Sequence, residues 1–146
     1  HPNQRIELGY LLSSEQLRSL STNGSLENSL TSINSLVKNH PENLSLNELI
    51  IGENSLGSLL SSAGFPSVPS SKDPAPNLGD PFFFGGSNTK LYGSRNRSGV
   101  DAIQLELNRQ NLRQESEDRI RFSKNFAAVI LSYLQQHYSD ALPAID

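Results

Sequence analysis

Three basic side chains follow a glycine pair in the second half of the chain and could bind an acidic ligand. Gly85 and Gly86 precede Lys90, Arg95 and Arg97. Ammonium and guanidinium groups form charge-assisted hydrogen bonds with carboxylates, and a glycine pair lets a ligand approach the backbone closely. The segment therefore predicts a site for the carboxylate of a small substrate, although the same glycines are also typical of a tight turn.

Other common catalytic groups are missing from the sequence or lack the spacing that their chemistry requires. The chain has no cysteine, which excludes a thiolate nucleophile, a disulfide and a zinc site built on cysteine. Its three histidines, His1, His40 and His137, form none of the short motifs that bind a metal ion. The sequence alone thus assigns no metal ligand to this chain.

Two segments of the sequence resemble the N-formylglutamate amidohydrolase family. The first is His1-Pro2 followed by Ile6-Glu7-Leu8-Gly9-Tyr10, and the second runs from Asp80-Pro81-Phe82 through Gly85-Gly86, Thr89 and Tyr92-Gly93 to Asp101-Ala102-Ile103-Gln104-Leu105-Glu106-Leu107-Asn108-Arg109. With the long C-terminal helix, the second segment extends the resemblance over residues 77–138. Residues 21–76 are similar to the family only in being helical.

The resemblance implies a zinc-dependent amidohydrolase with a carboxypeptidase-like α/β fold that cleaves the amide of a small N-acyl amino acid. In such enzymes the metal polarises the carbonyl and activates water, while a neighbouring carboxylate moves the proton. Glu106 falls on the glutamate of the family's strand and is the candidate general base. Arg109, Thr89 and Tyr92 fall on positions expected to hold the substrate or to form the walls of the site.

The family's zinc ligands belong to an Asp-x-His-Gly motif that would precede His1. The resemblance therefore implies zinc ligands outside this chain, which would be the C-terminal part of a larger domain, and it leaves the activity of the chain itself open. Glu106 also fits a plainer interpretation, a solvated glutamate on the wet face of an amphipathic strand. The alternative function is a secreted, glycosylated structural or assembly protein that reuses this scaffold without catalysis, and a module that binds a carbohydrate or a small acid is a third.

Composition limits the classes of partner. The net charge is −3 and no window carries a block of like charge, which argues against nucleic acid as a partner. The apolar runs are shorter than the ~20 residues that span a bilayer, which argues against a membrane protein. Three Asn-x-Ser/Thr triplets, at Asn23, Asn43 and Asn96, are acceptors for N-linked glycans and indicate a secreted or extracellular protein. The remaining partners are a small acyl-amino-acid substrate or a self-assembly partner.

Hydrophobic period and capping signals predict the elements that position these residues. Apolar residues alternate over 6–10, as in a half-buried strand. Ser13 and Ser45 each have a Gln or Glu three residues later, which is the capping-box spacing at the start of a helix. The spacing of leucine, isoleucine and valine over 26–37 predicts one further helix, and the leucines over 55–64 predict another.

The second half of the chain supplies a loop, a strand and a long helix. Five prolines within residues 65–81 predict a long surface loop, because proline cannot donate a backbone hydrogen bond. Alternation over 103–107 predicts a strand that carries Glu106, and an acidic first turn predicts a helix from Ser116. We predict an α/β fold in which helices cover a mixed or parallel sheet. The 146 residues are expected to form a single domain, with a strand and helical half at 1–64, a proline-rich loop at 65–81 and the remaining elements at 82–146.

Overall fold

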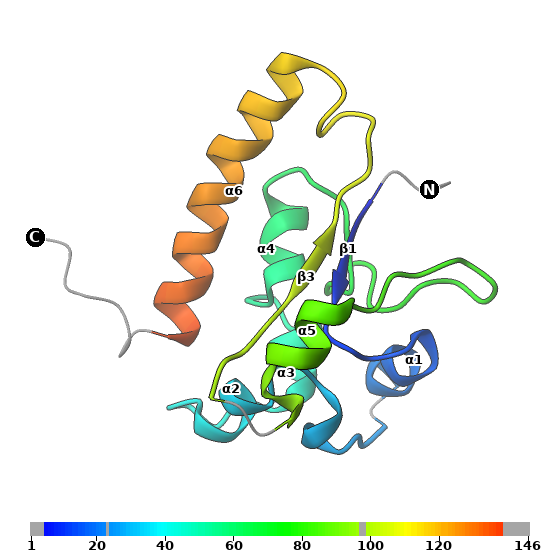
Figure 1. Ribbon diagram of the computed structural model, residues 1–146, viewed down its shortest axis with the longest axis vertical. Coiled ribbons are helices and arrows are strands. Elements are labelled where there is room, and N and C mark those ends of the chain that lie inside the picture. Colours follow the sequence, from blue (N-terminus) through cyan, green and yellow to red (C-terminus); the bar gives the residue numbers. More distant parts are fainter. Residues whose placement is uncertain (1–4, 23, 97–98, 139–146) are drawn as a thin grey trace, which may run out of the picture.

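Helices surround a small central sheet (Figure 1). The computed structural model describes residues 5–22, 24–96 and 99–138. Its elements are, in chain order, β1 (Ile6–Gly9), α1 (Ser14–Ser21), the 3₁₀ turn η1 (Asn28–Leu30), α2 (Asn34–Asn39), α3 (Leu46–Ile51), α4 (Leu56–Ser62), β2 (Ser67–Val68), α5 (Ser87–Tyr92), the 3₁₀ turn η2 (Ser94–Asn96), β3 (Gln104–Glu106) and α6 (Ser116–His137). Within these ranges no helix combines the length and the apolar character that crossing a membrane requires.

The sheet has three strands and mixed direction, with β1 in the centre. β2 runs parallel to β1 and places Ser67 opposite Ile6. β3 runs antiparallel to β1 on its other side and places Glu106 opposite Glu7. The predicted α/β class with a mixed sheet is therefore confirmed, while the carboxypeptidase-like topology stays a prediction.

One face of β1 forms the centre of the hydrophobic core. Ile6 and Leu8 are fully buried and belong to one cluster with the buried leucines of α4 and with Val129 and Tyr133 of α6. The long helix α6 runs alongside α4 at one side of the molecule (Figure 1). Burial of apolar side chains is the main source of folding free energy, so this layer of strand and helices fixes the direction of β1 and β3.

The other face of β1 is covered by an irregular segment, residues 82–86, rather than by a helix. Phe83 N–H donates to Glu7 Oε2 at 2.8 Å, and Leu11 N–H donates to the Phe84 carbonyl at 2.7 Å. The segment passes so close to Gly9 that a Cβ atom there would lie 2.6 Å from the Gly85 nitrogen. Gly9 is therefore required by the close approach of two backbones.

The local capping signals are confirmed. Ser13 and Ser45 accept from backbone N–H groups of α1 and α3, and the Gln16 and Glu48 side chains accept in return. The helix expected over 55–64 is also present as α4, and its N-cap is Ser55. These features depend on neighbours three residues apart, which is why the sequence shows them directly.

Two expectations about the first half of the chain are corrected. The helix expected over 26–37 is broken into η1 and α2, because Thr31 Oγ1 and Ser32 N–H both donate to the carbonyl of Tyr10. The loop expected over 65–81 contains the two-residue strand β2. In both places a contact with the β1 region supplies the hydrogen bonds that a local pattern cannot predict.

Two buried histidines join the end of α6 to the turns on either side of α3. Glu42 N–H donates to His40 Nδ1 at 3.2 Å, so the proton of His40 lies on Nε2, which contacts His137 Nδ1 at 3.0 Å. His137 Nε2 then donates to the Asn54 carbonyl at 2.9 Å. Each ring thus donates one hydrogen bond and accepts another. Burial and the neighbouring His40 lower the pKa of His137, whereas the Asn54 carbonyl and Glu42 raise it, and the net shift is downward.

We expect Gly9→Ala to lower the free energy of unfolding by about 1–3 kcal/mol, because the new Cβ overlaps the backbone of residues 84 and 85. Urea unfolding of the whole chain measures the change. The matched control is Gly99→Ala, where a Cβ meets nothing within 4 Å. Equal stability of the two variants would contradict the close approach.

We expect His137 to make the protein less stable as the pH falls. The unfolded chain binds a proton at His137 near the ordinary pKa of 6.5, whereas the folded pKa is lower, so stability is present above pH 6.5 and is lost below it. The contribution of one proton is at most about 1.4 kcal/mol per pH unit. His137→Gln keeps an acceptor and a donor without titrating, and urea unfolding between pH 5 and 7.5 should therefore show a weaker pH dependence. An unchanged dependence would exclude His137 as its source.

Candidate functional site

The candidate general base Glu106 lies on β3 directly opposite Glu7 of β1. Residues directly opposite each other in an antiparallel pair project to the same face of the sheet, with Cβ atoms roughly 4.5–5.5 Å apart. Glu7 is fully buried, whereas Glu106 is half-buried. The sheet thus holds two carboxyl groups side by side in environments of different polarity.

The environment of Glu7 favours its protonated form. Burial raises the pKa of Glu7 above its ordinary value of 4.5, the Phe83 N–H and the Arg5 guanidinium lower it, and Glu106 adds to the rise. The net direction is upward. A carboxyl group with a raised pKa, beside a more exposed one, is an arrangement that can separate acid and base roles in hydrolases.

Arg5 directly precedes β1 and connects the proline-rich loop to the start of this strand. Its Nη1 donates to Asp73 Oδ2 at 3.0 Å, and its Nη2 lies 3.6 Å from Asp80 Oδ2. Burial raises the pKa of Asp73 although Arg5 acts in the opposite direction. These ion pairs bring the start of the covering segment 82–86 toward the face that carries Glu7.

Thr89 and Tyr92 lie together on α5, beside the strand of Glu106. Thr89 is buried and its hydroxyl donates to the Gly86 carbonyl at 2.8 Å, while Tyr92 is 64% exposed. Both line an open cavity of about 630 Å³ between α5, β3 and α6. Gln104, Leu105 and Leu107 also line this cavity, whereas Glu106 does not.

The basic side chains predicted to bind the substrate, where they are described, do not line the cavity beside Thr89. Lys90 is exposed, with its ammonium 5.9 Å from the centroid of the Phe84 ring. Arg95, in η2, and Arg109, after β3, are also exposed. None of the three lines the cavity beside Thr89.

The remaining residues singled out from the sequence are His1, Arg97 and the asparagines of the three glycosylation triplets. Asn43 is exposed and has a positive φ of 54°, just before the N-cap of α3. His1, Asn23, Arg97 and the side chain of Asn96 lie outside the described part of the chain.

The described residues do not fit the zinc ion that the resemblance implies. Within 5–22, 24–96 and 99–138, no group of three His, Cys, Asp or Glu side chains could hold a metal ion. The ring nitrogens of His40 and His137 are already engaged with each other, with the Glu42 N–H and with the Asn54 carbonyl. No catalytic step proposed below therefore depends on a metal ion.

Comparison with the sequence models of known protein families, with curated proteins and with solved structures finds no match. The kinship with N-formylglutamate amidohydrolases thus stays a prediction from the sequence.

Glu7 is the functional candidate that sequence reasoning missed. The alternation over 6–10 assigned it to the wet face of a half-buried strand, yet all four residues of β1 are buried. The signal that could have found it is the glycine two residues later, because a glycine on the supposed wet face of a strand indicates close approach by another backbone. Gly9 therefore marks a covered face, on which a glutamate needs a partner.

We expect Glu7→Gln to gain stability relative to the natural protein as the pH rises from 4 to 7. A folded pKa above 4.5 means that the contribution of Glu7 is complete below pH 4.5 and is lost as the pH rises through the folded pKa. Glutamine still accepts from Phe83 N–H but does not titrate, and the difference is about 1.4 kcal/mol per unit of pKa shift. Urea unfolding at several pH values measures it. The control is the exposed Glu53→Gln, and a pH-independent difference for Glu7→Gln would show that its pKa is not raised.

Proposed function

We propose that this chain is the C-terminal part of an amidohydrolase that resembles N-formylglutamate amidohydrolase and cleaves the amide of a small N-acyl amino acid. One observation carries the proposal: Glu106 shares one sheet face with the buried Glu7, and the segment with the Gly-Gly pair covers that face. Residues from both segments of the sequence resemblance, Glu7 from the first and Glu106 from the second, are thus neighbours in space although they lie far apart in the chain.

In this mechanism Glu106 is the base and Glu7 is a positioning residue. Glu106, half-buried, accepts a proton from the attacking water and returns it to the leaving nitrogen. Glu7 holds the covering segment through Phe83 N–H. Because its raised pKa favours the neutral form, Glu7 limits the repulsion that a second carboxylate would impose beside Glu106.

Glu106 does not line the cavity beside Thr89 and Tyr92, so this cavity suits only a part of the substrate that lies away from the reacting amide, such as the amino-acid side chain. The cavity volume of about 630 Å³ lies within the usual range for small-molecule sites, and its walls combine apolar side chains, such as Leu105 and Phe122, with polar ones that include Asp101. Thr89 and Gln104 supply polar groups near the strand that carries Glu106.

The alternative is a secreted, glycosylated assembly protein without catalysis. The same cavity favours it, because Phe122, Phe126 and the exposed Tyr92 place apolar area at an open surface. Sugar at Asn23, Asn43 or Asn96 and a stable oligomer would support this function, and both can be measured by mass spectrometry and light scattering.

The decisive test is Glu106→Gln in the protein encoded by the complete gene. We expect kcat/KM for N-formyl and N-acetyl amino acids to fall about 10²–10⁴-fold, because glutamine cannot take up a proton. Release of the free amino acid measures the rate, and the exposed Glu53→Gln is the matched control with unchanged activity. Unchanged activity of Glu106→Gln would overturn the assignment of the base, and absence of amidase activity in the natural protein would favour the assembly function.

A further inference from the structure

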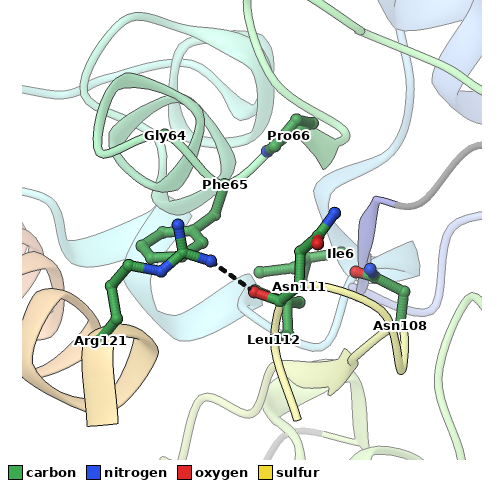
Figure 2. A pocket seen from close by; sticks show the side chains of 8 residues that line it. All are labelled: Ile6, Gly64, Phe65, Pro66, Asn108, Asn111, Leu112 and Arg121. Atoms are coloured by element: carbon green, nitrogen blue, oxygen red, sulfur yellow. Dashed lines mark hydrogen bonds between the residues drawn. The ribbon is translucent and has the colours of Figure 1, made fainter. Parts of the chain in front are cut away.

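A second cavity, separate from the one beside Thr89, opens where the turn between α4 and β2 meets the loop after β3 (Figure 2). Its volume is about 390 Å³. The lining residues come from four parts of the chain and are Ile6, Gly64, Phe65, Pro66, Asn108, Asn111, Leu112 and Arg121. Among the described residues, none that the sequence predicts to bind a substrate belongs to this lining.

The turn after α4 gives the cavity its aromatic wall. Gly64 has φ +90°, and Phe65 N–H donates to the Leu60 carbonyl at 2.9 Å, which closes α4 in a left-handed cap. This cap directs the Phe65 ring against Phe122 of α6, with ring centroids 5.1 Å apart and an edge-to-face angle of 89°. Phe65 is almost fully buried, so the wall is rigid.

Arg121 places the cationic group of the cavity over this wall. Its guanidinium carbon lies 5.9 Å from the centroid of the Phe65 ring, and its Nη2 donates to the Asn111 carbonyl at 2.7 Å (Figure 2). Stacking on an aromatic ring and a short bond to a backbone carbonyl both restrict a side chain that would otherwise be mobile. The guanidinium is therefore held at the cavity although the side chain is 56% exposed.

Arg121 retains donors for a ligand. A guanidinium carries five N–H groups, and both hydrogen bonds of Arg121, to the Asn111 carbonyl and to Asp118 Oδ1 at 3.3 Å, start from Nη2. Among the described residues, no hydrogen bond starts from its Nε or Nη1. The ion pair with Asp118 is exposed and weak, so it does not remove the attraction for an anion.

The other walls determine what kind of anion fits. Ile6 and Leu112 are buried apolar residues, and Pro66 adds a further apolar surface. Asn108 and Asn111 are uncharged, so Arg121 is the one charged residue among the described residues of the lining. A single guanidinium beside apolar walls suits a singly charged group on an apolar body, because a more highly charged anion would lose more hydration than one arginine can replace.

We propose that this cavity is a binding site for small carboxylic acids with a compact apolar body, such as a phenyl or branched aliphatic group. The carboxylate accepts from Arg121 Nη1, and the apolar body lies against Phe65, Pro66 and Leu112. This site is distinct from the Glu106 face and does not depend on the amidohydrolase function.

The test is a titration of the isotope-labelled full chain with 3-phenylpropionate, followed by amide NMR shifts. We expect saturable shifts at Phe65, Asn111 and Leu112, with a Kd on the order of 1 mM. The uncharged 3-phenylpropionamide should bind at least about tenfold more weakly, because it removes the charge but keeps the shape. Inorganic phosphate is the second probe, and binding tighter than that of 3-phenylpropionate would overturn the proposed ligand class.

Two variants test the site, one by removing the positive charge and the other by adding a negative charge at its rim. Arg121→Gln removes the cation and should weaken 3-phenylpropionate binding about tenfold or more. Asn111→Asp places a carboxylate at the rim, keeps a residue type that tolerates the positive φ of 64° and should also weaken binding. Lys124→Gln is the control, because it removes one exposed positive charge one turn further along α6 without touching the cavity.

The outcomes separate clearly. Weaker binding in Arg121→Gln and Asn111→Asp, with Lys124→Gln unchanged, supports the site. Shifts spread over the whole surface, or equal binding to Arg121→Gln and the natural chain, would overturn it. If Arg121→Gln fails to fold, the test depends on Asn111→Asp and on 3-phenylpropionamide. Weaker binding in both cases supports the site, and unchanged binding in both overturns it.

Discussion

The hydrogen bond from Phe83 N–H to the buried carboxyl group of Glu7 is the contact on which the polar side of the sheet depends. Residues 82–86 form no regular element, so their backbone groups must find partners outside the segment. Glu7 and Gln104 supply two acceptors, the latter for Gly86 N–H at 2.9 Å, and Leu11 N–H supplies the donor for Phe84. Together these bonds hold an irregular segment across the face of the sheet that carries Glu7.

Glu7 anchors the covering segment through this contact, and the proposed mechanism gives it a second role beside Glu106. A carboxyl group that only anchors a backbone N–H would be equally well served by an amide, which has no proton to lose. A carboxyl group that shapes the chemistry of Glu106 acts through its proton, since its charge changes the repulsion between neighbouring groups. Glutamine at position 7 preserves the first role and removes the second, so the pH dependence distinguishes structure from chemistry.

The parts of the fold that the sequence predicted correctly depend on local interactions. Ser13 and Ser45 cap their helices through residues three positions away, and alternation located the strand of Glu106. The burial of Glu7 was missed because its partner Phe83 lies 76 residues further along the chain. The prediction of one helix over 26–37 was wrong for a similar reason. Thr31 Oγ1 and Ser32 N–H donate to the carbonyl of Tyr10, which is distant in sequence, and the helix is interrupted there.

The positions of the basic side chains also depend on tertiary contacts that the sequence does not predict. Lys90 and Arg95 were grouped because they are close in sequence, but both are exposed and neither lines a described cavity. No sequence pattern singled out Arg121, and only the packing of α6 against the end of α4 brings it over Phe65. An arginine becomes a ligand-binding group when an aromatic wall and a backbone carbonyl fix its guanidinium, and both fixing groups here come from other parts of the chain. Charge spacing in a sequence therefore predicts where cations are available, whereas the tertiary contacts determine which of them faces a cavity.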